Sequence, residues 1–124
     1  MKLNNREFDR IVKGAVMRIP EEIRQHLENI VISVQKRPSA ELLEEIGFDA
    51  EDELLGLFQG TSQIERSITS PPLFPDTILL FQEPLEEICE TVEELEEEIE
   101  ITIVHEIAHA LGMSEEKLAE LGYE

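Results

Sequence analysis

The sequence is poor in cysteine and in long hydrophobic runs. Cys89 is the only cysteine among the 124 residues, which excludes an internal disulfide and is typical of a reducing compartment. No apolar run approaches the roughly 20 residues that span a bilayer. The polar start, MKLNNREFDR, predicts that there is no signal peptide. We therefore expect a cytoplasmic protein that has no membrane partner.

Positive charge is also scarce. Ten lysines and arginines stand against 29 acidic residues, of which 25 are glutamate, and the formal net charge is −19. Such a surface repels a phosphate backbone, so nucleic acid is a poor partner. It could attract basic or cationic substrates. The simpler interpretation is that the charge only keeps the protein soluble.

The rest of the composition is that of a globular protein, with 41% hydrophobic and 31% charged residues. We find no internal repeat and no linker, so residues 1–124 are expected to form a single domain. An apolar helical stripe predicts a helix in residues 5–17, and a second helix can begin at Pro20. Strands are predicted at 29–38, 54–60 and 77–82, with a partly helical stretch at 39–53 and a surface loop at 61–76. Helices mixed with strands, without strict alternation, predict an α+β fold.

The last long helix is predicted to run from Thr91 to about Leu111. Thr91 and Glu94 have the spacing of a capping box. Residues 83–100 include ten acidic side chains and no basic one, which is typical of a solvated face. From Ile101 the pattern inverts, because ITIVHEIAHALGM is apolar nearly all round. We therefore expect that half of the helix to be buried.

Three ionisable residues interrupt this apolar half in an HExxH arrangement. His105 and His109 are four residues apart, so their Cβ atoms are expected roughly 5–6 Å apart on one helical face. Two imidazoles at that spacing can bind one zinc ion. Glu106 lies beside this face, where it is poorly directed to bind the ion but can reach a water next to it, as a general base must. A chance match on the buried half of a capped helix is a poor alternative, because it requires both conditions at once.

Two histidines do not complete a catalytic zinc site, which has three protein ligands. The spacing HExxHxxGxxE places Glu115 ten residues after His105, where related motifs carry their third ligand. Gly112 is expected to end the helix with a positive φ and to let the chain reverse toward the metal. Ser114 has the character of an N-cap, which gives Glu115 a second role in the first turn of a final helix. The alternatives for the third ligand are Glu116, Glu120, His26 or water.

Other candidates for chemistry have simpler interpretations. We expect Cys89 to be a buried helix residue rather than a ligand, and His26 to be exposed on a polar helix. Tyr123, the only tyrosine, could stabilise an oxyanion, but packing is the more ordinary role for an aromatic residue near a C-terminus.

The sequence resembles the small zincin-like metallopeptidases of prokaryotes. The similarity runs through FDRIVKGAVMRIPEEIRQHLENIVISVQ, LLGLFQGTSQIERS, PDTILLFQEPLEEI and TIVHEIAHALGMSEEKLAELGY. It implies a minimal zincin-like fold, in which a short mixed β-sheet packs against the active-site helix. It also implies zinc ligands at His105, His109 and the acidic residue at 115, with Glu106 as the base. The family often has aspartate at that last position, and glutamate is one methylene longer.

The resemblance implies a zinc-dependent peptidase that acts on a peptide or protein substrate. An extended peptide is expected to add to an exposed sheet edge beside the metal, and we predict TILLFQ, 77–82, as that edge. One alternative is a metal-stabilised interaction module without catalysis. Another is an RNA-processing metallohydrolase, which the net charge and the presence of Glu106 disfavour. The sequence gives no indication of the oligomeric state.

Overall fold

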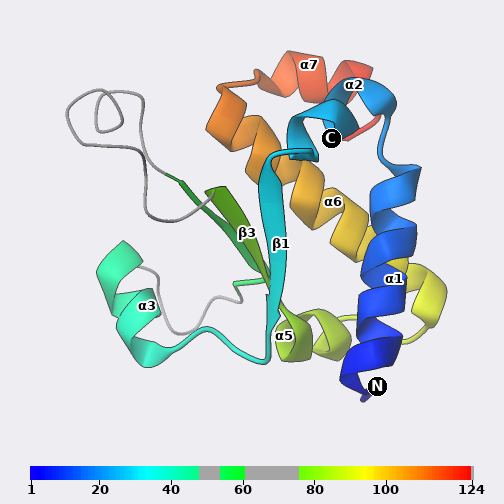
Figure 1. Cartoon of the computed structure of the whole chain (residues 1–124), viewed down its shortest axis with the longest axis vertical. Helices are drawn as coiled ribbons and strands as arrows, with labels where there is room; N and C mark the ends of the chain where they lie inside the picture. The colour runs from blue at the N-terminus through cyan, green and yellow to red at the C-terminus, as the bar shows by residue number, and fades with distance from the viewer. Residues whose placement is uncertain (48–53, 61–75, 124) are drawn as a thin grey trace.

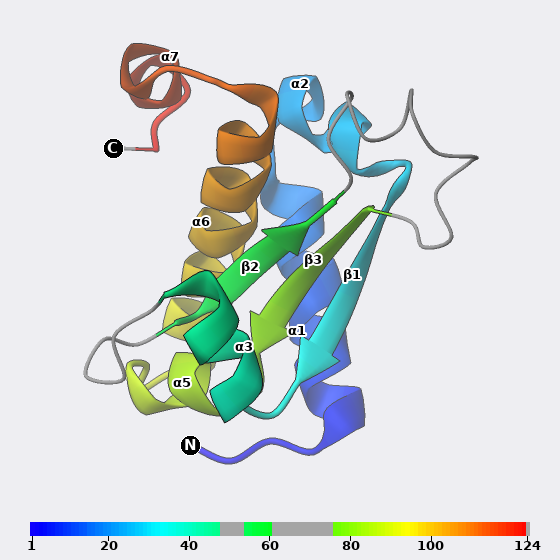
Figure 2. The same cartoon turned by 90° about the vertical axis from the view of Figure 1, so that its left-hand side faces the viewer.

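The computed structural model describes residues 1–47, 54–60 and 76–123, and these form an α+β fold (Figure 1). Helices α1 and α6 lie side by side behind a three-stranded sheet, and α3 lies on the other side of the sheet (Figure 2). Residues 48–53 and most of the predicted loop 61–76 fall outside the described part of the chain. In chain order the elements are α1 (Asn5–Arg18), α2 (Glu21–Arg24), η1 (Gln25–Leu27), β1 (Ile30–Gln35), α3 (Ala40–Ile46), β2 (Gly56–Gln59), β3 (Asp76–Phe81), α5 (Gln82–Glu87), α6 (Val92–Leu111) and α7 (Glu115–Glu120).

Helix α1 follows its local sequence signals. The Asn4 side chain accepts a hydrogen bond from the Glu7 amide, and the Glu7 carboxylate accepts one from the Asn4 amide. This reciprocal cap satisfies two amides that a helix start leaves without partners. The predicted apolar stripe is confirmed, because Phe8, Val12 and Ala15 are buried against the rest of the fold. None of the helices in the described residues is long and apolar enough to cross a membrane.

The sheet has the order β1-β3-β2, with β1 parallel and β2 antiparallel to β3. The prediction that residues 77–82 form an exposed edge is therefore wrong, since β3 is the central strand. Its residues from Ile78 to Phe81 are all buried. An unbroken apolar run is typical of a strand with both faces covered, and this signal points to the centre of the sheet rather than to its edge.

Helix α5 is not predicted from the sequence. The predicted strand 77–82 is expected to be closed by Pro84, but Gln82 is the first residue of α5, and Pro84 lies in the first turn of this helix. Proline is tolerated there because the first amides of a helix have no intrahelical acceptor. Pro84 therefore belongs to the start of a helix rather than to the end of a strand.

Helix α6 begins and ends where the sequence predicts. The Thr91 hydroxyl accepts from the Glu94 amide, although the Glu94 carboxylate accepts from the Glu90 amide rather than from Thr91 itself. The prediction of full burial after Ile101 is wrong for the last turn, because His109–Leu111 are exposed. This turn extends past the four-residue strand β2 (Figure 2), so the described part of the sheet does not cover it.

Gly56 allows α6 to pack closely on β2. A Cβ atom at this position would lie 2.6 Å from Cγ2 of Thr102 and 3.0 Å from the carbonyl oxygen of Leu79. From the sequence alone, a glycine within a strand reads only as a weakness. In the structure it gives the helix room to approach the strand backbone, which is a known use of glycine within strands.

We predict that Gly56→Ala lowers the free energy of unfolding by about 1–3 kcal/mol, the usual cost of overpacking. Urea denaturation would measure the loss. Thr102→Ser removes the clashing methyl group, so the double variant should recover part of the stability beyond the sum of the two single changes. Strict additivity of the two changes would contradict this account of the contact.

Candidate functional site

The last two turns of α6 carry the histidine pair. His105 is half-buried, and His109 is exposed in the final turn. Neither imidazole has a hydrogen-bond or ion-pair partner among the described residues. Their four-residue spacing on a continuous helix places both rings on one side of α6. The ring nitrogens are therefore available to a ligand.

Glu106 is tied to the edge of the sheet. Its Oε1 atom accepts a hydrogen bond from the backbone amide of Phe58 at 2.9 Å. Phe58 lies in β2, which pairs with β3 on one side and forms an edge of the described sheet on the other. The Phe58 amide thus points away from β3 and holds one carboxylate oxygen of Glu106. Its second oxygen, Oε2, remains for other contacts.

The close packing at Gly56 explains this hydrogen bond. Glu106 lies one helical turn after Thr102, a rise of about 6 Å. Phe58 lies two residues after Gly56, a rise of about 6.6 Å along the strand. The helix and the strand therefore advance together from the first contact to the second. No sequence signal marks a backbone amide as a partner, and the isolated glycine in LLGLFQG is the nearest clue.

The turn after α6 is as predicted. Gly112 ends the helix with φ +70, and the Met113 amide donates back to the carbonyl of Ala108 at 2.8 Å. Ser114 then caps α7 by accepting from the Lys117 amide. Glu115 is exposed in the first turn of this helix.

The structure does not gather a complete set of metal ligands. Across the ranges 1–47, 54–60 and 76–123, no three His, Cys, Asp or Glu side chains lie close enough together to hold a metal ion. The chemistry of the predicted ligands still fits zinc, which binds imidazole nitrogen and carboxylate oxygen. His105 and His109 lie on α6, whereas Glu115 lies in the first turn of α7 and is not grouped with them.

Comparisons with known proteins agree with this fold. A family model described as zincin-like metallopeptidase matches residues 27–123. The structure is similar to that of a conserved hypothetical protein from Thermus thermophilus, with a TM-score of 0.53 and 19% identity. The similarity covers 94% of this chain and 98% of that chain. At this identity the likeness shows the fold alone. No curated protein matches the chain.

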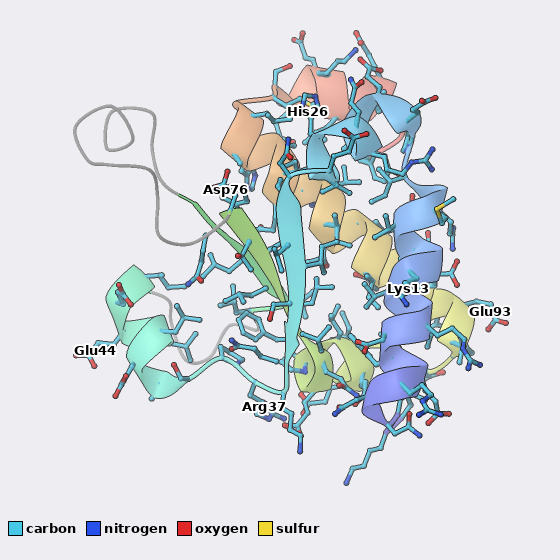
Figure 3. All side chains as sticks on the ribbon, in the orientation of Figure 1. Lys13, His26, Arg37, Glu44, Asp76 and Glu93 are labelled. Carbon is cyan, nitrogen blue, oxygen red and sulfur yellow. The ribbon has the colours of Figure 1, made fainter. Side chains whose placement is uncertain are left out.

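Neither Cys89 nor His26 forms a group of metal ligands with the histidine pair in the described residues. Cys89 is buried as predicted, but it lies in the connection between α5 and α6 rather than in a helix. Burial raises the pKa of its thiol, which opposes formation of a reactive thiolate. His26 is exposed in the short helix η1, as predicted (Figure 3).

Tyr123 has a structural role. Its side chain is buried, and its hydroxyl donates to Oε2 of Glu100 at 2.5 Å. The other oxygen of Glu100 forms an ion pair with Arg18 at 3.0 Å. Tyr123 therefore fastens the end of the chain to α6, and Arg18 extends the link to α1. Burial, together with the Glu100 carboxylate, holds the pKa of Tyr123 well above its ordinary value.

We predict that Tyr123→Phe lowers the free energy of unfolding at pH 7 by about 1–3 kcal/mol, as for loss of a hydrogen bond to a charged group. The raised pKa gives this contribution a pH dependence. It is fully present below the pKa of the unfolded tyrosine, about 10, and is lost as the pH rises further. Urea denaturation of the wild type and of Tyr123→Phe should show a smaller difference in the free energy of unfolding above pH 10 than at pH 7. A difference that stays constant would contradict the assignment.

Proposed function

Because the chain belongs to the zincin-like metallopeptidase family, we propose that it is a zinc-dependent peptidase with Glu106 as its general base. The observation that carries this proposal is the position of Glu106. It lies next to His105 on α6, and its carboxylate is fixed to the edge strand β2 by the Phe58 amide. An HExxH base is thereby held beside both a histidine pair and a strand edge.

His105, His109 and Glu115 would hold the zinc ion, with one ion per chain. When bound, zinc supplies a positive charge that makes water more acidic and polarises a peptide carbonyl. Glu115 would join the histidines by movement of the turn from Gly112 to Ser114. The Glu115 side chain is exposed, so the movement would break backbone contacts of the turn, such as the hydrogen bond from the Met113 amide to the carbonyl of Ala108, rather than a contact of Glu115 itself.

Glu106 would move the proton. Its Oε2 atom accepts a proton from the attacking water and then delivers it to the nitrogen of the leaving amine. The hydrogen bond from Phe58 to Oε1 limits rotation of the carboxylate, so the basic oxygen keeps its direction during both steps. Holding a catalytic group in one orientation lowers the entropic part of the barrier.

The substrate would be a peptide or a protein, bound in extended form along β2. This replaces the edge predicted from the sequence, since β3 is central and β2 is the edge in contact with α6. An added strand offers backbone hydrogen bonds to the outward groups of β2 other than the Phe58 amide, which Glu106 occupies, and it brings a peptide bond next to Glu106.

Substitution of a histidine tests the proposed metal site. His105→Ala should reduce zinc from about one ion per chain to near zero, because two ligands hold zinc poorly. Its melting temperature should also fall, since the stabilisation that a bound ligand gives the folded state is lost. His26→Ala removes a histidine outside α6 and is the matched control, with unchanged zinc content. Full zinc occupancy in His105→Ala would show that the ion binds elsewhere.

The third ligand is tested by comparing two neighbouring glutamates of α7. Glu115→Ala should weaken zinc affinity about tenfold or more. Glu116→Ala should change it little, because a charge in the first turn of a helix contributes only about 0.3–1 kcal/mol. Competition with a zinc chelator would measure both affinities. The reverse order of effects would assign the ligand to Glu116.

The role of Glu106 is tested by Glu106→Gln. This variant keeps an oxygen that can accept from the Phe58 amide but lacks the basic oxygen. Peptide hydrolysis should fall by about 10²–10⁴-fold, the usual contribution of a general base. Zinc content and melting temperature should stay near those of the wild type, because no ligand is lost. Hydrolysis at the wild-type rate would mean that another group accepts the proton, and loss of zinc would make Glu106 a ligand.

A further inference from the structure

Positive charge is concentrated in the first part of the chain. Residues 1–37 contain eight of the ten lysines and arginines and five acidic residues, which gives a net charge of +3. Residues 38–124 contain two basic and 24 acidic residues, which gives −22. Helix α6, with the proposed active site, belongs to the acidic part, whereas α1 and β1 belong to the cationic part. The two parts should therefore attract partners of opposite charge.

An apolar groove lies in the cationic part, between α1 and β1. Its volume is about 570 Å³. The apolar lining comes from α1 and from the side chains of β1 that face α1: Val12, Val16, Met17, Ile32 and Val34. Asp9 and Lys13 stand at its rim, and Met17 is 69% exposed. An open apolar groove on a highly charged protein marks a site of interaction.

The strand beside this groove can accept another strand. In the described part of the sheet β1 pairs with β3 alone, so its second edge has no neighbouring strand. Its sequence, IVISVQ, has no charged residue and no proline, and Val31 is 47% exposed. Edge strands are usually protected by lysine or proline within them. Here such residues come only after the strand, at 36–38.

Four cations that form no ion pair in the described residues lie on α1, before it, or after β1. Lys13 lies on its rim, and Arg6 lies seven residues earlier, within about 20° of Lys13 around α1. Lys2 and Lys36 line a second recess of about 350 Å³ at the start of α1, where β1 ends. None of these four forms an ion pair within the described residues, whereas Arg18 and Arg37 are each paired with two glutamates.

Two carboxylates in the second recess are already engaged. The Glu86 side chain accepts from the Leu3 amide and from Nε2 of Gln82. Glu83 is paired with Arg37. Neither Lys2 nor Lys36 forms an ion pair with these carboxylates in the described part of the chain.

We propose that α1 and β1 form a docking surface for an extended acidic segment of a partner protein. The segment adds to β1 as a fourth strand and places apolar side chains in the groove. Its carboxylates lie against Lys13, Arg6, Lys2 and Lys36. A second copy of this chain is a poorer occupant, because symmetric pairing of β1 with β1 brings the same cations face to face. The surface lies at the opposite edge of the sheet from Glu106, so the proposal does not depend on the peptidase function.

The test uses a fluorescent twelve-residue peptide of alternating valine and threonine that ends in four glutamates. A matched peptide ends in four lysines. Fluorescence anisotropy with the full chain should show binding of the acidic peptide and, at the same concentrations, little binding of the basic one. Affinity should fall as salt rises, because the contacts are between exposed charges.

Three variants locate the contact. The double variant Lys13→Glu/Lys36→Glu should weaken binding of the acidic peptide about tenfold or more. Met17→Asp should also weaken binding, because it places a charge in the apolar lining of the groove. Lys117→Glu makes the same kind of charge reversal on α7, where Lys117 pairs with Glu22, and should leave binding unchanged. Equal binding of both peptides, no binding of the acidic one, or equal effects of all variants would overturn the proposal. The proposal would also be overturned if sedimentation showed a dimer that Met17→Asp dissociates, since a second copy of the chain would then occupy the surface.

Discussion

The approach of α6 to the backbone of β2 is the constraint on which the rest of the site depends. Gly56 leaves no side chain between the strand and Thr102, and one helical turn later the Phe58 amide meets the Glu106 carboxylate. The residues that follow on α6 are then fixed in rotation as well as in height. A wider helix–strand spacing would leave Glu106 free to rotate and the Phe58 amide without its partner.

The distribution of charge complements this geometry. The glutamates of α6 are mostly solvated, and a few of them hold other elements: Glu96 and Glu100 pair with Arg18 of α1, and Glu100 also accepts from Tyr123. These contacts hold α1 and Tyr123 against α6. Of the other cations in the first 37 residues, Lys13 lines the groove beside β1, and Lys2 and Lys36 line the second recess at the start of α1. The two edges of one small sheet thus face different chemical surroundings, one beside the proposed catalytic glutamate and one beside lysine and arginine.

Local features of this fold could be predicted from the sequence because their causes are local. The start of α6 at Thr91, its end at Gly112 and the cap at Ser114 follow from side chains within four residues of each boundary. The apolar run of β3 indicates a central strand, although the edge is predicted at 77–82, but it does not identify the strands on either side, so the full strand order could not be predicted. The contact between Phe58 and Glu106 joins a backbone amide to a residue 48 positions away, and no side-chain pattern records it. The histidine pair is visible in the sequence because a helix brings residues four apart together.

The central claim is that the end of α6 and the turn after it form a zinc site of two imidazoles and a carboxylate. Metal analysis of protein purified without added metal, combined with X-ray absorption at the zinc edge, tests it most directly. We expect about one zinc ion per chain in a shell of nitrogen and oxygen ligands, at the roughly 2.0–2.2 Å typical of such bonds. Protein that is free of zinc and does not take it up, or a shell that contains sulfur from Cys89, would contradict the account.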